Sequence, residues 1–244
     1  MELLLMSNGT APGREYLAHA LETLDALLQG VDRVAFVPYA QRSLDAHTEF
    51  VAAAMRPLGV EVVGVHRGVE PHRVVESAGA VFVGGGNAFR LLAALYRHGL
   101  VQAIQSAVTR GAVYVGSSAG TNVACPTIRT TNDMPIVEPP SLDALRLVPF
   151  QINPHYPAAE VLNGHLGETR DERIAEFLED NDVPALGLQE GSWLHVTEAT
   201  ARIGGVAGAR LFLRDAPAEN LVPGSEISFL MSTQPRYDDP SPDL

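Results

Sequence analysis

Five small residues carry the clearest chemical signal in this chain. Gly116-Ser117-Ser118-Ala119-Gly120 follow the apolar run Ala112–Val115 and precede the expected start of a helix at Thr121–Ala124. A strand, then G-x-S-x-G, then a helix is typical of a nucleophile elbow, whose crowded backbone demands small residues two positions either side of the nucleophile. Ser118 meets that demand with two glycines, whereas Ser117 would have Val115 on one side. We therefore predict Ser118 as a nucleophile; a simple Gly/Ser turn is the alternative.

A run of three glycines, Gly84 to Gly86, followed by Asn87, ends another expected strand. Without side chains, such a backbone can approach a ligand closely. We predict that the amides of Gly86 and Ala119 form an oxyanion hole beside the elbow. The alternative is a flexible turn into the next helix. A dinucleotide site is disfavoured because the run lacks the third glycine of that motif.

A serine nucleophile needs a base, and the base needs an acid that orients it. The chain has eight histidines, and His155 follows directly after an expected strand at Val148–Asn153. Catalytic groups of α/β sheets lie at such strand ends, so His155 is the predicted base. Asp133 lies in the proline-rich segment after the elbow and is the predicted acid, with Glu138 and Asp143 as rivals.

The composition excludes several other chemistries. All 17 basic residues are arginine, so no lysine is present for a Walker A loop, a Schiff base or a Ser–Lys dyad. The net charge of −12 disfavours nucleic acid and anionic membranes as partners. The single cysteine, Cys125, allows no internal disulfide and precedes a proline rather than standing on an elbow. The histidines are scattered and H-E-x-x-H is absent, so we predict neither a metal nor an organic cofactor.

Short apolar runs alternate with helical patterns over the first half of the chain, which predicts a mostly parallel sheet with helices on both faces. The expected strands are Glu2–Ser7, Arg33–Pro38, Val60–His66, Ala80–Gly84 and Ala112–Gly116, and the expected helices are Glu15–Leu28, Leu44–Arg56, Val74–Ser77, Phe89–Tyr96 and Val101–Arg110. A capping box at Thr169–Glu172 predicts one later helix. Short strands with glycine turns predict a small antiparallel portion near the C-terminus, at Ala185–Gln189, Trp193–Thr197, Ala201–Ile203 and Arg210–Leu213.

No linker divides the chain, so we predict one domain over residues 1–232 and a disordered acidic tail over 233–244. The first residues lack a basic segment, and no apolar run approaches the ~18 residues that a membrane span needs. We therefore expect a cytoplasmic protein.

Four longer stretches carry a resemblance: VGGGNAF, GSSAGTNVACPTIRTTNDMPIV, QINPHY and GHLGETRDERI. With these the chain resembles the peptidase E family of serine peptidases, from the first strand to about Gly204-Gly205. The resemblance implies the fold of class I glutamine amidotransferases and a triad of Ser118, His155 and Asp133. It also implies hydrolysis of dipeptides with an N-terminal aspartate, as a monomer or homodimer. Ser117 departs from the family, which commonly has a bulky aromatic residue there.

An N-terminal aspartate in the substrate needs a cation for its side chain, and in this chain the cation must be an arginine. We expect Arg170, in the family-matching stretch GETR, with Arg129 as the second choice. Asn87, Glu168 and His165 are weaker candidates for orienting the substrate. Two alternatives remain open: a cyanophycinase-like peptidase that cuts β-Asp-Arg units, and a catalytically silent protein that binds an acidic metabolite.

Overall fold

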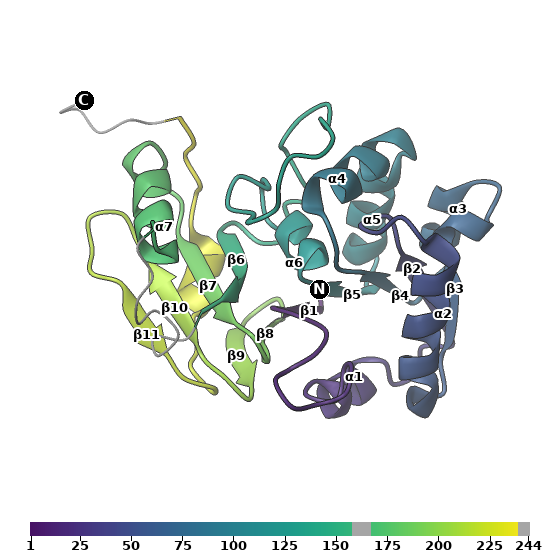
Figure 1. Ribbon diagram of the computed structural model, residues 1–244. Coiled ribbons are helices and arrows are strands. Elements are labelled where there is room, and N and C mark those ends of the chain that lie inside the picture. Colours follow the sequence, from purple (N-terminus) through teal and green to yellow (C-terminus); the bar gives the residue numbers. More distant parts are fainter. Residues whose placement is uncertain (158–166, 239–244) are drawn as a thin grey trace.

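The computed structural model describes residues 1–157 and 167–238, which form two β-sheets side by side (Figure 1). The larger sheet has seven strands in the order β3-β2-β4-β5-β1-β8-β9. Its first five strands run parallel, and β8 and β9 add in antiparallel fashion at the β1 edge. The strands are β1 (Leu3–Met6), β2 (Arg33–Val37), β3 (Glu61–Gly64), β4 (Ala80–Val83), β5 (Val113–Ser117), β8 (Ser192–Val196) and β9 (Ala201–Gly205).

The smaller sheet has four strands in the order β11-β10-β7-β6. Strands β6 and β7 pair in parallel, and β10 and β11 continue the sheet with antiparallel pairing. Its strands are β6 (Gln151–Tyr156), β7 (Ala185–Gln189), β10 (Ala209–Phe212) and β11 (Glu219–Leu221). The chain passes between the two sheets at the tight turn from β7 to β8, so the end of β7 lies close to the first sheet.

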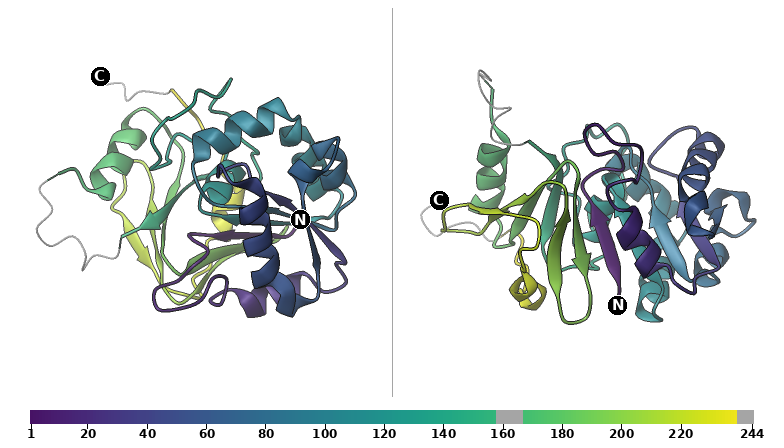
Figure 2. Two further views of the ribbon diagram at one scale, coloured as in Figure 1. Left: turned by 45° about the vertical axis from the view of Figure 1, so that its right-hand side comes forward. Right: turned by 90° about the horizontal axis from the view of Figure 1, so that it is seen from below.

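Helices cover both faces of the larger sheet (Figure 2). Alternate side chains of β1 explain this, because Leu3 and Leu5 join one apolar cluster and Leu4 and Met6 the other. On the first face lie α3 (Pro71–Glu76), α4 (Ala88–Arg97), α5 (Leu100–Thr109) and α6 (Ala119–Ala124), and on the second lie α1 (Leu21–Leu27) and α2 (Leu44–Met55). The predicted fold class is therefore confirmed, and α7 (Arg170–Glu179) packs on the smaller sheet. Short 3-10 helices complete the fold: η1 (Arg56–Leu58), η2 (Val65–Arg67) and η4 (Ser228–Ser232).

Two predicted helices differ from the structure. The helix expected from Glu15 begins only at Leu21, because Leu17 adopts a left-handed conformation with φ 64° that no α-helix continues. The Leu17 side chain is nevertheless buried in the core, so its apolar character marks packing and not a helix. The third predicted helix starts earlier, at Pro71, a residue that suits the first turn of a helix.

The C-terminal segment is ordered further than the sequence predicts. Arg236 pairs with Asp182, Tyr237 accepts a hydrogen bond from Gln151, and Asp238 binds Arg129 through two hydrogen bonds of 2.7 and 3.0 Å. Residues 233–238 belong to the predicted disordered tail, and Arg236, Tyr237 and Asp238 contact the rest of the chain in this way. The remainder of that predicted tail lies outside the described residues.

In the part of the chain that the structure describes, no helix is long and apolar enough to cross a membrane.

Candidate active site

Ser118 stands on a strained turn between β5 and α6. Its φ of 54° and ψ of −109° lie outside the regions that most residues adopt. A Cβ atom on Gly116 would lie 2.8 Å from the carbonyl oxygen of Gly120, and one on Gly120 would lie 2.0 Å from that of Val83. Both positions therefore require glycine, which agrees with the steric argument for Ser118 over Ser117 as the residue at the centre of the elbow.

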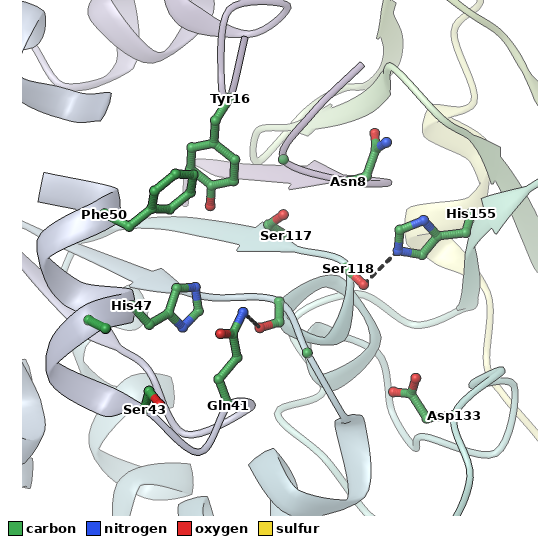
Figure 3. Close-up of a pocket in the computed structure, with 14 residues that line it drawn as sticks. Asn8, Tyr16, Gln41, Ser43, His47, Phe50, Ser117, Ser118, Asp133 and His155 are labelled. Carbon is green, nitrogen blue, oxygen red and sulfur yellow. Dashed lines mark hydrogen bonds between the residues drawn. The ribbon is translucent and has the colours of Figure 1, made fainter. Parts of the chain in front are cut away.

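The hydroxyl of Ser118 meets the imidazole of His155, although the two residues come from different sheets (Figure 3). The distance from Ser118 Oγ to His155 Nε2 is 2.8 Å. His155 lies inside β6 and has a φ of 55°, at an irregularity in the pairing of β6 with β7. This local distortion leaves its side chain exposed while its neighbours in the strand are buried.

A buried serine holds His155 in place from behind. The hydroxyl of Ser7, at the end of β1, accepts a hydrogen bond of 2.9 Å from the His155 amide and donates one of 2.8 Å to the carbonyl of Leu188 in β7. One side chain of the larger sheet thus fixes two strands of the smaller sheet. This connection aligns His155 with Ser118.

The acid beside His155 is Glu190. Its Oε1 lies 2.8 Å from His155 Nδ1, the ring nitrogen that faces away from Ser118. Glu190 directly follows β7, the parallel neighbour of β6, so both side chains leave the same edge of the smaller sheet. Both side chains are about half exposed, at 42% for His155 and 49% for Glu190. Ser118, His155 and Glu190 form the sequence of contacts that a serine hydrolase uses.

The expectation that Asp133 orients His155 is not met by this geometry. Asp133 Oδ2 instead accepts a hydrogen bond of 2.6 Å from the amide of Ala88, at the first turn of α4. A carboxylate is favourable there, because the first amides of a helix lack partners within the helix. Asp133 still lines the same cavity as Ser118 and His155, so it faces the reaction centre without contacting the base.

The glycine run after β4 lies against the nucleophile. A Cβ atom on Gly85 would lie 3.2 Å from Ser118 Cβ, and Gly86 has a φ of 141° that favours glycine. Both glycines line the cavity at Ser118, and Ala119 opens α6 directly behind it. The proximity agrees with the place that an oxyanion hole needs, and the roles of the Gly86 and Ala119 amides remain predictions.

Residues 3–204 match the model of a known family, described as peptidase family S51. A Peptidase E of Streptomyces coelicolor is 54% identical to this chain over 238 residues, which cover 98% of each protein. A Peptidase E of Shigella flexneri is 50% identical over 208 residues, covering 84% of this chain and 90% of that relative.

The chain belongs to peptidase family S51.

The fold agrees with this membership. The crystal structure of a Peptidase E protein from Listeria monocytogenes EGD-e superposes with a TM-score of 0.64 at 23% identity, covering 84% of this chain and 98% of that one. A peptidase from an acI-B1 Actinobacterium gives a TM-score of 0.70 at 18% identity, covering 93% and 96%. At these identities the likeness shows a shared fold.

Other residues that the sequence suggested for substrate binding have different places in this S51 peptidase. Asn87 caps α4 by accepting from the amide of Arg90 at 3.0 Å, and its Nδ2 donates to the carbonyl of Met134 at 2.9 Å. Both ends of this amide are therefore engaged in the fold. Glu168 forms an ion pair with Arg173 at 3.6 Å. His165 lies outside the described residues.

Arg170 lines a second cavity of about 260 Å³, together with Asn132 and Asn153. These two residues neighbour Asp133 and His155 in sequence, so the second cavity adjoins the segments that carry the site. Within the described residues, the buried Nη1 of Arg170 has no hydrogen-bond partner. Burial, together with the nearby Arg173, lowers the pKa of Arg170. Arg129, the second choice, is held by Asp238.

Cys125 is unsuited to nucleophilic chemistry in this S51 peptidase. It is fully buried, and burial raises the pKa of its thiol to about 12. Its Sγ accepts a hydrogen bond of 3.2 Å from the amide of Ile152, which joins α6 to β6. Among the residues that the structure describes, no group of three or more His, Cys, Asp or Glu side chains could hold a metal ion.

Sequence reasoning missed Glu190, Ser7 and one wall of the cavity. Glu190 follows an apolar strand, in LQEG, and this position is a usable signal because catalytic groups of α/β sheets lie at strand ends. Ser7 also follows an apolar strand. The cavity has a volume of about 600 Å³, and its further wall consists of Tyr16, His47 and Phe50. Nothing in the local sequence of these three residues distinguishes them from core or surface positions.

Proposed function

We propose that this S51 peptidase is a cytoplasmic serine exopeptidase that hydrolyses dipeptides with an N-terminal aspartate. The observation that supports the serine mechanism is the continuous contact from Ser118 Oγ through the His155 ring to Glu190. This proposal replaces Asp133 with Glu190 as the acid of the triad. No metal or organic cofactor takes part.

The reaction proceeds through an acyl-enzyme. His155 Nε2 takes the proton of Ser118 as its oxygen attacks the carbonyl carbon, and Glu190 stabilises the imidazolium that forms. The amides of Gly86 and Ala119 donate hydrogen bonds to the oxyanion. The C–N bond then breaks, and His155 gives its proton to the departing amine. A water molecule, deprotonated by His155, attacks the ester and releases the aspartate with Ser118 restored.

Two charged groups would recognise the N-terminal residue. The Asp133 carboxylate faces the cavity and uses only Oδ2 on Ala88, so it would accept hydrogen bonds from the substrate's α-ammonium group. Arg170 would meet the substrate side chain, since the described residues that line the cavity at Ser118 include no arginine. A buried guanidinium nitrogen without a partner is costly unless a ligand supplies one. Glu168 and His165 belong to the same stretch and would assist Arg170.

Replacing Arg170 with methionine tests the assignment of the cation. Loss of one member of a buried charge pair costs about 2–5 kcal/mol, so kcat/KM for Asp-Leu should fall about 30-fold to several thousand-fold. Asn-Leu, which places no charge against Arg170, should lose far less. Equal losses on both substrates would show that Arg170 supports the fold instead.

A panel of four peptides tests the activity itself. Steady-state rates on α-Asp-Leu, β-Asp-Leu, Glu-Leu and Asp-Leu-Leu should show α-Asp-Leu as the best substrate. Preference for the β-linked peptide would favour a cyanophycinase-like peptidase. Failure to cleave any of the four peptides, together with no reaction with a fluorophosphonate probe, would favour a catalytically silent protein that binds an acidic metabolite.

A further inference from the structure

The cavity at Ser118 extends away from His155 into a space with an aromatic wall. Tyr16, from the segment before α1, and His47 and Phe50, from α2, lie on the side of Ser118 opposite His155 in Figure 3. These three residues are called the aromatic wall below. Ser117 lies between this wall and the nucleophile.

The aromatic wall is built from rings that support one another. The Tyr16 and Phe50 ring centroids are 4.8 Å apart, with the planes inclined at 56°. Tyr16 lies against Gly9 so closely that a Cβ there would come within 2.0 Å of the ring. His47 and Phe36 pack in a T-shaped arrangement with ring centroids 5.0 Å apart, and His47 lies one turn from Phe50 on the same face of α2.

Phe50 has the features of a ligand contact more than of a core residue. Its side chain is 54% exposed although it lines a cavity and touches Tyr16. Partial exposure of a large apolar ring at a cavity leaves apolar area that a ligand can cover. Ser117, in contrast, offers only a small side chain at the end of β5, so the space between wall and nucleophile stays open.

The charges around the cavity indicate which part of a dipeptide enters this space. Asp133, which would hold the α-ammonium group, is drawn on the His155 side of Ser118 in Figure 3. Arg170 lines the other cavity, beside Asn132 and Asn153. Both groups proposed for the N-terminal aspartate therefore lie away from the aromatic wall. The aromatic wall is therefore available to the residue on the other side of the scissile bond.

We propose that the aromatic wall binds the side chain of the residue that is released as the amine, and that it selects large apolar or aromatic side chains there. This inference rests on the proposed dipeptidase function and adds a preference at the second position. Ser117 acts as the residue that sets the size of the space.

The test compares Asp-Phe with Asp-Ala in the wild type and three variants. Wild-type kcat/KM should be about 10-fold or more higher for Asp-Phe. Ser117→Trp fills the space and should reduce the Asp-Phe to Asp-Ala ratio about 10-fold. Phe50→Ala removes one ring and should reduce it about 5-fold. Phe229→Ala is the matched control, because Phe229 is also 54% exposed but does not line this cavity, and it should keep the wild-type ratio.

The ratio is insensitive to partial unfolding, because both substrates report on the same preparation. A ratio that neither Ser117→Trp nor Phe50→Ala changes would overturn the proposal. Variants that alter selectivity for the first residue, in a comparison of Asp-Leu with Glu-Leu, would place the wall on the acyl side and would overturn it as well.

Failure of the proposed function gives a different result. If the wild type prefers another N-terminal residue, the same Phe to Ala comparison in that series still tests the wall. If no dipeptide is turned over, calorimetric titration of Ser118→Ala with Asp-Phe and Asp-Ala provides the test. Tighter binding of Asp-Phe, lost in the double variant with Phe50→Ala, supports the proposal, and equal affinities refute it.

Discussion

Ser117 and Ser118 are adjacent and chemically alike, but only Ser118 stands on the strained turn and reaches His155. Ser118→Ala should lower kcat for Asp-Leu by about 10⁴-fold or more, because the triad acts as a unit. Ser117→Ala should cost less than about 10-fold. Circular dichroism spectra of both variants would establish that they are folded. A greater loss in the Ser117 variant would reverse this assignment.

The two carboxylates near His155 make different contacts and should respond differently to amidation. Glu190→Gln leaves an amide against His155 Nδ1 and misdirects the imidazole, so kcat should fall about 10²- to 10⁴-fold. Asp133→Asn keeps the size of the side chain but removes the charge proposed for the substrate ammonium, so KM should rise more than kcat falls. Separate kcat and KM values decide between them, and a larger kcat loss for Asp133→Asn would return it to the triad.

At the scale of residues, the sequence predicts what depends on local sterics. The glycines around Ser118 distinguish it from Ser117 because their steric requirement arises within five residues. The acid depends on the pairing of β6 with β7, two strands separated by 28 positions between Tyr156 and Ala185. No local pattern encodes that pairing, so the sequence pointed to Asp133, through its place after the elbow and the family resemblance, and did not single out Glu190.

At the scale of elements, Gly120 controls how closely α6 packs on the sheet. A Cβ atom there would lie 2.0 Å from the carbonyl oxygen of Val83 in β4, and backbone cannot move aside cheaply. Gly120→Ala should therefore lower the free energy of unfolding by about 1–3 kcal/mol or more, and should also displace Ser118 and reduce activity. Urea denaturation and the Asp-Leu rate provide the two measurements.

Gly79→Ala is a suitable control for this prediction. A Cβ atom on Gly79 would meet only the Val31 side chain, at 3.3 Å, and a methyl group there can give way. Its effect on the unfolding free energy should stay below about 1 kcal/mol. If Gly120→Ala were as stable and as active as Gly79→Ala, the close approach of α6 to β4 would not exist in solution.

The elements that the sequence predicted best are the parallel strands β1, β2, β4 and β5. Each is apolar on both faces because helices cover both sides, and this yields continuous apolar runs. The late start of α1 at Leu21 could not be predicted in the same way. Leu17 contributes a buried apolar side chain from a turn, and residue type alone does not distinguish that from a helical position.

At the scale of the whole molecule, the candidate active site lies where the two sheets meet. Ser118 comes from the larger sheet, and His155 and Glu190 from the smaller one. Ser7 connects them by hydrogen bonds to both β6 and β7. The sequence showed one sheet with a small antiparallel portion, because the division into two sheets depends on which distant strands pair. Activity should consequently be more sensitive to substitutions where the two sheets pack together than to substitutions at their outer edges.

The response of the fold to acid involves histidines away from the triad. Burial lowers the pKa of three histidines, His19, His47 and His98. Their unfolded forms bind protons near pH 6.5, whereas the folded forms stay neutral to lower pH. Since the unfolded state binds more protons, stability is fully present above about pH 6.5 and falls as the pH drops below it.

We therefore expect the free energy of unfolding, measured with urea at pH 7.5, 6.5 and 5.5, to decrease over this range. Carboxylates with lowered pKa, such as Asp45 and Glu172, lose their stabilising contacts only near and below about pH 4, so they do not account for a decrease at pH 5.5 to 6.5. His19→Gln removes one of the three groups and should flatten the pH dependence by up to about one proton. Either of two results would show that neither histidine resists protonation in the folded protein. One is a free energy of unfolding that is constant from pH 7.5 to 5.5, and the other is a pH dependence that is the same in His19→Gln and His47→Gln as in the wild type.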